Sequence, residues 1–252
     1  MRTLVLPDLH GRVEVLVGIL ERAGPFDAIV SVGDAIHGGR ETGDRDMELL
    51  DRLLDMDGLL DKRIEVVVGN HELPYLGGTA FAGWDPRSPV GPVLQRLDEE
   101  GVIVPCALVD GYLITHAGVG PHLGYVTAES AFKGLSKLWR NRPAHTSVRL
   151  SQYRPVDDDY ARTFLMVGRR RGGWEPFGGV TWRDDHEPLA DFPQVYGHTP
   201  GEAVQYHAWG VGVEQDVGAD LGVCIDLGVG LQSGRYAWAT IEDGVLEVKE
   251  HG

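Results

Sequence analysis

Side chains that bind divalent metals stand directly after short apolar runs at five places along the chain. Each run is rich in Val, Ile or Leu, which is the pattern of a buried strand. Each is followed by Asp, Asn or His near a glycine. The polar residues are Asp8 and His10, Asp34, Asn70 with His71 and Glu72, His116, and His198. Carboxylate, amide and imidazole groups repeated in this way point to a metal site.

The five places differ in how specific a signal they give. Asp8 and His10 are one residue apart, so both side chains point to the same face if the strand continues that far. In Gly69-Asn70-His71-Glu72, the Asn side-chain oxygen can bind a metal while the next residue stays free to act on a substrate. Asp-x-His alone is a weak signal that is more often ordinary surface chemistry, and the motif at 69–72 is stronger. The prediction rests on all five places in order.

The elements that must position these residues alternate between strands and helices in the first half of the chain. This order predicts right-handed crossovers and a mainly parallel sheet, and the ends of such strands meet at one crevice. Residues scattered from 8 to 198 can therefore share one site. The pattern predicts helices at 13–23, 46–60 and 89–100 and strands at 3–6, 28–32, 64–68, 102–104, 112–115 and 194–196.

The second half of the chain is less regular. We interpret residues 121–176 as a cap or insertion over the site, because they combine an amphipathic stretch, the basic run Arg169-Arg170-Arg171 and paired glycines. Residues 222–248 alternate as short strands, and Asp243-Gly244 is a hairpin signal. We expect one domain over residues 1–252.

The composition is that of an ordinary globular protein, with 42% hydrophobic and 24% charged residues. The formal net charge of -15 argues against a nucleic-acid partner, because binding through phosphates needs a basic surface. Phosphorylated substrates remain compatible with this charge, since bound divalent metals reverse the local field.

Cysteine usage and hydropathy favour a cytoplasmic protein. Cys106 and Cys224 are predicted to be buried free thiols rather than a disulfide. No stretch approaches the ~20 apolar residues that span a bilayer, so we expect no membrane partner. The first residues lead directly into a predicted strand and lack the pattern of a signal peptide.

The ordered motifs resemble those of the calcineurin-like metallophosphoesterase superfamily. The chain is most similar to the branch of serine/threonine protein phosphatases and diadenosine tetraphosphatases. Its last motif, Gly197-His198-Thr199-Pro200, has one histidine where the phosphodiesterase branch has two. Gly179-Val180-Thr181-Trp182-Arg183 and Cys224-Ile225-Asp226-Leu227-Gly228 extend the similarity. The resemblance implies an α/β sandwich of two mixed β-sheets flanked by helices.

The resemblance also implies a role for each motif residue. The side chains that bind two metal ions would be, in chain order, Asp8, His10, Asp34, Asn70, His116 and His198. The first ion would be bound by Asp8, His10 and Asp34. The second would be bound by Asp34, Asn70, His116 and His198, so the Asp34 carboxylate would bridge both ions. His71 would protonate the leaving group as general acid, and Glu72 would brace its loop. Mixed oxygen and imidazole ligands favour Mn, with Fe or Zn as alternatives, and the nucleophile would be a metal-bridging hydroxide.

Two phosphate-binding arginines of the protein phosphatases have no counterpart at the expected positions. That branch follows Gly-Asp with two residues and then Asp-Arg-Gly, where this chain has His37-Gly38-Gly39. The missing Asp would have oriented the general acid, and Val68 stands where a second arginine often occurs. We consider Arg40 and Arg183 as substitutes, because an Arg fork matches phosphate geometry. His37 is a third candidate, in contact with the phosphate or with the general acid.

Other residues that could do chemistry are interpreted as structural. Asp226 precedes a turn and is expected to cap a loop. The run of arginines at 169–171 is read as a solvated face, with an anionic substrate as the alternative. Three tryptophans are expected to pack rather than to stack on a nucleobase, namely Trp139, Trp174 and Trp182. The remaining histidines are assigned no role, namely His122, His145, His186, His207 and His251.

These expectations converge on hydrolysis of phosphate esters. The leading prediction is a phosphomonoesterase of the protein-phosphatase type, acting on a phosphorylated small molecule, a nucleotide or a phosphoprotein. The alternative is hydrolysis of a nucleotide polyphosphate such as diadenosine tetraphosphate. A non-catalytic interaction module is a third hypothesis, against which the complete set of ligands and His71 argue. The sequence makes no prediction of the oligomeric state.

Overall fold

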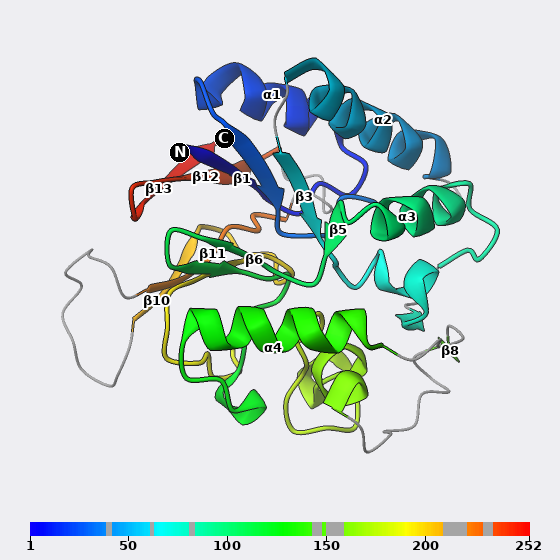
Figure 1. Cartoon of the computed structure of the whole chain (residues 1–252), viewed down its shortest axis with the longest axis vertical. Coiled ribbons are helices and arrows are strands. Elements are labelled where there is room, and N and C mark those ends of the chain that lie inside the picture. The colour runs from blue at the N-terminus through cyan, green and yellow to red at the C-terminus, as the bar shows by residue number, and fades with distance from the viewer. Residues whose placement is uncertain are drawn as a thin grey trace.

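Two β-sheets lie face to face in the centre of the molecule, and helices cover their outer faces (Figure 1). The structure, a computed structural model, describes residues 1–38, 42–60, 63–80, 84–142, 148–149, 159–208, 221–228 and 234–252. Helices α1 (Val13–Ala23), α2 (Gly43–Leu60) and α3 (Val90–Glu99) contact one sheet, and α4 (Ala128–Arg140) contacts the other. The predicted α/β sandwich of two mixed sheets is confirmed.

The first sheet has six strands in the order β13-β12-β1-β2-β3-β5. Its parallel part contains β1 (Thr3–Leu6), β2 (Ala28–Ser31), β3 (Arg63–Val67) and β5 (Ile103–Val104). The antiparallel strands β12 (Tyr236–Glu242) and β13 (Val245–His251) complete it next to β1. Because β1, β2 and β3 run in one direction, the loops that follow them emerge at the same edge.

The second sheet has five strands in the order β10-β11-β9-β7-β6. Strands β7 (Tyr112–Ile114), β9 (Gln194–Tyr196) and β11 (Leu221–Cys224) are parallel, whereas β6 (Ala107–Val109) and β10 (Gln205–Ala208) pair antiparallel at the edges. A short parallel pair, β4 (Thr79–Ala80) and β8 (Val148–Arg149), lies apart. The loops after β7 and β9 therefore also share one edge.

Alternation along the strands builds two separate cores. In β1, Leu4 and Leu6 face the helices, whereas Val5 belongs to the apolar layer between the sheets. That layer is formed mainly by Val, Ala and Ile side chains from both sheets. Burying a side chain of this size stabilises the fold by roughly 1.5–3 kcal/mol. Packing between the sheets thus holds their two loop-bearing edges together.

Several local predictions are confirmed. Helix α1 has the predicted bounds, and α2 begins at Gly43, three residues before the predicted start. The hairpin between β12 and β13 turns at Asp243 and Gly244, both with positive φ, as a type I′ turn requires. Cys106 and Cys224 are buried and free.

The segment predicted as a cap contains α4, 3₁₀ helices at Pro121–Leu123 and Arg169–Arg171, and a π-helix at Ala161–Leu165. A further 3₁₀ helix follows β3 at Leu73–Leu76. Helix α4 packs on β6 and β7 and buries its apolar face there, so it is a layer of the sandwich. A capping role for the rest of the segment stays a prediction.

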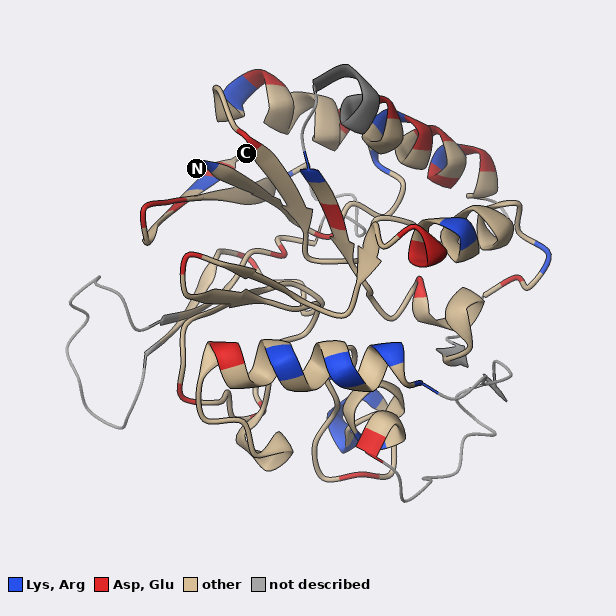
Figure 2. Cartoon of the chain, in the orientation of Figure 1, with Lys and Arg blue, Asp and Glu red and all other residues tan. Residues whose placement is uncertain are grey.

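Charge is distributed unevenly over the helices. Acidic residues gather along α2 and basic residues along α4 (Figure 2). Among the described residues, none of the helices is sufficiently long and apolar to cross a bilayer.

Candidate metal centre

The loops after β1, β2, β3 and β9 line one cleft of about 340 Å³. Its walls come from both sheets and from the 3₁₀ helix at 169–171. The lining residues are His10, Asp34, His37, Asn70, His71, Arg171, Trp182, His198, Pro200, Asp226 and Gly228. Strand ends separated by nearly 190 residues of sequence therefore meet, as their placement predicts.

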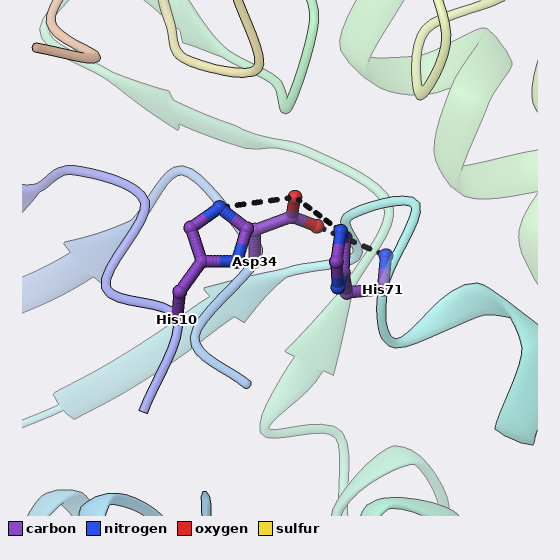
Figure 3. A group of neighbouring side chains, drawn as sticks. All are labelled: His10, Asp34 and His71. Atoms are coloured by element: carbon purple, nitrogen blue, oxygen red, sulfur yellow. Dashed lines mark hydrogen bonds and ion pairs between the residues drawn. The ribbon is translucent and has the colours of Figure 1, made fainter. Parts of the chain in front are cut away.

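Asp34 lies at the centre of the cleft, and its two oxygens face different groups. Oδ2 is 3.8 Å from His10 Nε2 and 3.7 Å from His71 Nε2 (Figure 3). Oδ1 is 3.5 Å from His116 Nε2 and accepts a hydrogen bond of 3.0 Å from the His71 N–H. The carboxylate thus belongs to two clusters of possible metal ligands, one with His10 and His71 and one with His116 and His198. This is the placement that a bridging ligand needs.

His116 Nε2 lies close to two other atoms that can bind a metal. Its Nδ1 donates to the Val32 carbonyl at 3.1 Å, and burial lowers the pKa of this imidazole to about 3, so Nε2 carries a lone pair. Asn70 Oδ1 lies 2.8 Å and His198 Nδ1 lies 3.0 Å from that atom. Ligand atoms that each lie about 2.0–2.2 Å from one ion are spaced in this way. The donor set fits a divalent cation.

Asp8 provides further support for a cation. The carboxylate is fully buried; Oδ2 accepts a hydrogen bond of 2.9 Å from the His198 N–H, and Oδ1 has no hydrogen-bond partner. His198 Nε2 is likewise buried without a partner. Unpartnered buried polar atoms are costly. A bound ion would satisfy the free Asp8 oxygen, whereas the His198 ring can present only one of its two nitrogens to that ion. The compact cluster around His10 contains His71 rather than Asp8, and the assignment of Asp8 as a ligand stays a prediction.

Buried charges of one sign crowd the site. Burial first, and then the charges of Asp226 and Asp34, raise the pKa of Asp8 well above its usual range. Burial and the charge of Glu72 do the same to the pKa of Asp34. The neighbouring imidazoles are neutral, because burial lowers the pKa of His10 and His198. Divalent ions reverse such a field and stabilise the ionised carboxylates.

Three of the predicted ligands have strained backbones. His10, Asp34 and His198 have φ values of 47°, 47° and 75°. Residues other than glycine adopt positive φ at a cost of about 1–3 kcal/mol, and such residues cluster at functional sites. Tight contacts explain the glycine before two of them: a Cβ on Gly33 would lie 2.9 Å from His116 Nδ1, and one on Gly197 would collide with Asp8 Oδ1.

Glu72 braces the loops after β2 and β3. Its carboxylate accepts hydrogen bonds from the N–H groups of Asp34 at 3.0 Å, Ile36 at 3.1 Å and Gly69 at 2.9 Å. Burial raises its pKa to about 7, and these hydrogen bonds act in the opposite direction. The hydrogen bonds expected of Glu72 are therefore present.

The general acid candidate is oriented by a main-chain group. His71 Nδ1 donates to the carbonyl oxygen of His37 at 2.5 Å, which takes the place of the missing Asp. Nε2 is thereby directed toward Asp34 and the cleft. Burial lowers the pKa of His71 to about 4, and the His37 carbonyl counteracts this by favouring the protonated ring. The His37 side chain also lines the cleft.

The arginine candidates lie in different places. Arg183 is buried outside the residues that line the cleft; it donates to the carbonyls of Ala117 at 2.7 Å and Glu187 at 2.6 Å and pairs with Asp185 at 3.3 Å. The structure therefore gives no support to a phosphate contact by Arg183. Arg40 lies outside the described residues.

Arg171, which the sequence placed on a solvated face, lines the cleft. Its Nη2 donates to Thr199 Oγ1 at 2.5 Å and its Nε lies 3.2 Å from Asp184 Oδ2. Its positive charge acts with burial to lower the pKa of His198. The only signal in the sequence was the basic run itself.

Comparison with known proteins identifies the family. The family model for calcineurin-like phosphoesterases matches residues 1–210, so the chain belongs to that family and is a phosphoric ester hydrolase. None of the curated protein sequences matches it.

Solved structures share the fold at low sequence identity. The cold-active protein-tyrosine phosphatase of a psychrophilic Shewanella species has a TM-score of 0.61 and 17% identity, over 98% of this chain and 80% of that one. A protein serine/threonine phosphatase from Saccharomyces cerevisiae has a TM-score of 0.55 and 14% identity, over 99% and 79%. A structure whose assignment as a diadenosine tetraphosphatase is provisional has a TM-score of 0.43 and 18% identity, over 99% and 93%.

Proposed function

We propose that this protein is a metal-dependent phosphomonoesterase whose reaction takes place in the cleft around Asp34. The observation that carries the proposal is the position of this carboxylate between two ligand clusters, with His71 Nε2 3.7 Å from its Oδ2. Metal ligands and a proton donor then face one bound phosphate.

Six side chains would hold two divalent ions, with Mn as the first choice. They are Asp8, His10, Asp34, Asn70, His116 and His198. When bound, such a pair of ions supplies an activated water and stabilises the charge that develops on the phosphoryl group. The protein's own contribution is to fix these ligands on strand ends of two packed sheets, so that the ligand positions do not depend on substrate.

His71 would protonate the leaving oxygen. Its Nδ1 proton is committed to the His37 carbonyl, so only Nε2 can deliver a proton into the cleft. A general acid of this kind contributes about 10²–10⁴-fold to the rate. The anionic substrate would raise the pKa of the ring, because a nearby negative charge favours the imidazolium.

Arg171 would bind the phosphate in place of the missing arginines. It lines the cleft beside Pro200 and Trp182, and Asp184 and Thr199 hold its guanidinium from one side. The remaining donors suit phosphate oxygens, for which the planar fork of arginine is well matched.

The size of the cleft suits a phosphate monoester. Its volume of about 340 Å³ lies near the lower end of the roughly 300–1,000 Å³ of ligand sites. The Shewanella and Saccharomyces cerevisiae structures, with TM-scores of 0.61 and 0.55, are both named as protein phosphatases. Nucleotide polyphosphate hydrolysis is the second candidate, because the Trp182 ring lines the cleft and could stack on a base.

Three substrates would separate these candidates in one assay. Turnover of p-nitrophenyl phosphate, a phosphopeptide and diadenosine tetraphosphate is measured with Mn²⁺ and again after chelation. We expect the monoesters to be hydrolysed and the chelator to abolish turnover. Hydrolysis of the dinucleotide alone would overturn the monoesterase proposal. A protein that binds no Mn²⁺ and hydrolyses none of the three would be an interaction module.

A further inference from the structure

A buried carboxylate outside the motif residues holds the loop that orients His71. We propose that Asp46, in the first turn of α2, is a positioning residue for the general acid. Its effect passes through the main chain of His37 and Gly38. The inference rests on the proposed role of His71.

Asp46 binds the loop with both carboxylate oxygens. Oδ1 accepts a hydrogen bond of 2.8 Å from the His37 N–H, and Oδ2 accepts one of 2.9 Å from the Gly38 N–H and one of 3.0 Å from Thr42 Oγ1. The side chain is completely buried. Charge-assisted hydrogen bonds of this kind are about twice as strong as neutral ones, so this carboxylate fixes two consecutive peptide groups.

A second hydrogen bond, which starts from the same peptide segment, orients the imidazole of His71. The carbonyl of His37, whose own N–H is bound by Asp46, accepts the Nδ1 proton of His71 at 2.5 Å. His37 is therefore the single residue that connects the Asp46 carboxylate to the general acid His71. Movement of this residue would remove the acceptor of the Nδ1 proton and allow the ring to rotate.

Two further features show that the site is built around this carboxylate. Gly11 approaches it so closely that a Cβ there would lie 2.5 Å from Asp46 Oδ1. The Tyr75 hydroxyl lies 2.9 Å from the Gly38 carbonyl, to which it donates, so the loop is held from two directions. The positive end of the α2 dipole also favours a negative charge in the first turn.

The proposed effect on catalysis is specific to proton delivery. In hydrolysis a water oxygen forms a bond to phosphorus and loses a proton to solvent, while the bond between phosphorus and the leaving oxygen breaks. The leaving oxygen takes the proton from His71 Nε2 and departs as the alcohol, and His71 regains its proton from solvent. A poor leaving group needs this proton, whereas a stable phenolate departs with less help. Loosening the His37 carbonyl should therefore slow poor substrates most.

The test compares two aryl phosphates in the Mn²⁺-loaded protein. Asp46→Ala and Asp46→Asn are assayed on phenyl phosphate, a poor leaving group, and on p-nitrophenyl phosphate, a good one. The matched control is Asp44→Asn, an exposed acid in the same helical turn. His71→Asn serves as the benchmark for loss of the acid.

We expect Asp46→Ala to lower kcat on phenyl phosphate by about 10–100-fold, the usual effect of removing a group that orients a functional side chain. The loss on p-nitrophenyl phosphate should be much smaller, the KM values and metal content should change little, and Asp44→Asn should behave like the wild type. Asp46→Asn keeps one acceptor oxygen and should show the same selectivity in a weaker form, which preserves the test if the alanine variant does not fold.

An independent readout is the tautomer of His71 in the metal-free protein. Two-bond ¹H–¹⁵N correlation spectra, assigned with His71→Asn, should show the proton on Nδ1 in the wild type and a mixture of tautomers in Asp46→Asn. An equal loss of kcat on both substrates, or an unchanged tautomer, would overturn the positioning role while the selectivity of His71→Asn keeps the proposed function. If His71→Asn itself shows no selectivity between leaving groups, the role of His71 fails and the inference fails with it.

Discussion

The two sheets supply different kinds of groups to the same cleft. The six-stranded sheet presents contiguous motifs after β1, β2 and β3, and buried carboxylates hold the loops that carry them. Glu72 and Asp46 together bind five main-chain N–H groups of these loops. On this side the carboxylate groups of two residues accept all five of these main-chain hydrogen bonds.

The five-stranded sheet presents single histidines instead. His116 and His198 follow β7 and β9, and a mixture of groups supports their loops. Arg183 donates to the Ala117 carbonyl at 2.7 Å, Asp8 accepts a hydrogen bond of 2.9 Å from the His198 N–H, and Thr115 Oγ1 accepts one of 3.1 Å from the Gly118 N–H. The difference suggests a division of labour. One side would hold metal and position the acid, whereas the other would only complete the metal ligands.

The largest loss of metal and activity is expected at Asp34, which lies between the ligands from the two sheets. Asp34→Asn removes the shared negative charge, so both ions should be lost and turnover of p-nitrophenyl phosphate should fall roughly 10³-fold or more, since metal ions supply several kcal/mol of stabilisation. Metal content after dialysis and steady-state rates measure this. Asp110→Asn is the control, because Asp110 shares the positive φ but lies in a hairpin turn. Retention of two ions by Asp34→Asn would contradict a shared ligand.

Matched histidine variants on the two sides should fail for different reasons. His71→Asn should keep its metal and lose about 10²–10⁴-fold in kcat. His198→Asn should lose affinity for metal, and excess Mn²⁺ should restore much of its activity. Isothermal titration with Mn²⁺ and rates at several metal concentrations distinguish these outcomes. If added metal rescued His71→Asn instead, His71 would be a ligand and the assignment of the acid would be wrong.

Variants of two arginines in the second half of the chain should affect different properties, one the binding of the phosphate and the other the stability of the fold. Arg171→Gln should lower kcat/KM by about 10–100-fold, the equivalent of one hydrogen bond to a charged group, and leave Tm nearly unchanged. Arg183→Gln breaks a buried pair with Asp185 and should lower the free energy of unfolding by about 3–5 kcal/mol. Thermal melts and kinetics on the folded fraction give both values. The reverse pattern would place the phosphate contact at Arg183.

The smallest effects are expected for the free energy of unfolding, when side chains that hydrogen-bond the loops of either sheet are changed. Glu72→Gln leaves buried N–H groups without an acceptor and should lower the free energy of unfolding by about 1–3 kcal/mol. Thr115→Val removes a single neutral hydrogen bond, worth about 1 kcal/mol. Urea titrations of the metal-free proteins compare the two. Equal losses would remove the distinction between a carboxylate that accepts three N–H groups and a hydroxyl that accepts one.

The strand-end residues were predictable because local sequence determines their position. A strand that ends before Asp34 or His71 places that residue at the sheet edge, and parallel order brings the edges together. The arginines were not predictable in this way. The direction of Arg171 depends on Asp184 and Thr199, and that of Arg183 depends on carbonyls up to 66 residues away.

The support for His71 was also hidden from the sequence. A main-chain carbonyl replaces the missing Asp, and every residue has a carbonyl, so no residue type marks it. Asp46 reads as an ordinary acidic residue in the first turn of a helix. Only the fold shows that it is buried against the loop after β2.

The central claim is that Asp34 lies between two metal ions. The most direct measurement is an anomalous difference map from crystals grown with Mn²⁺. Two bound ions should give two peaks roughly 3.5–4 Å apart, one on the side of His10 and the other among Asn70, His116 and His198, with the Asp34 carboxylate touching both. A single peak, or two peaks that do not share Asp34, would contradict it.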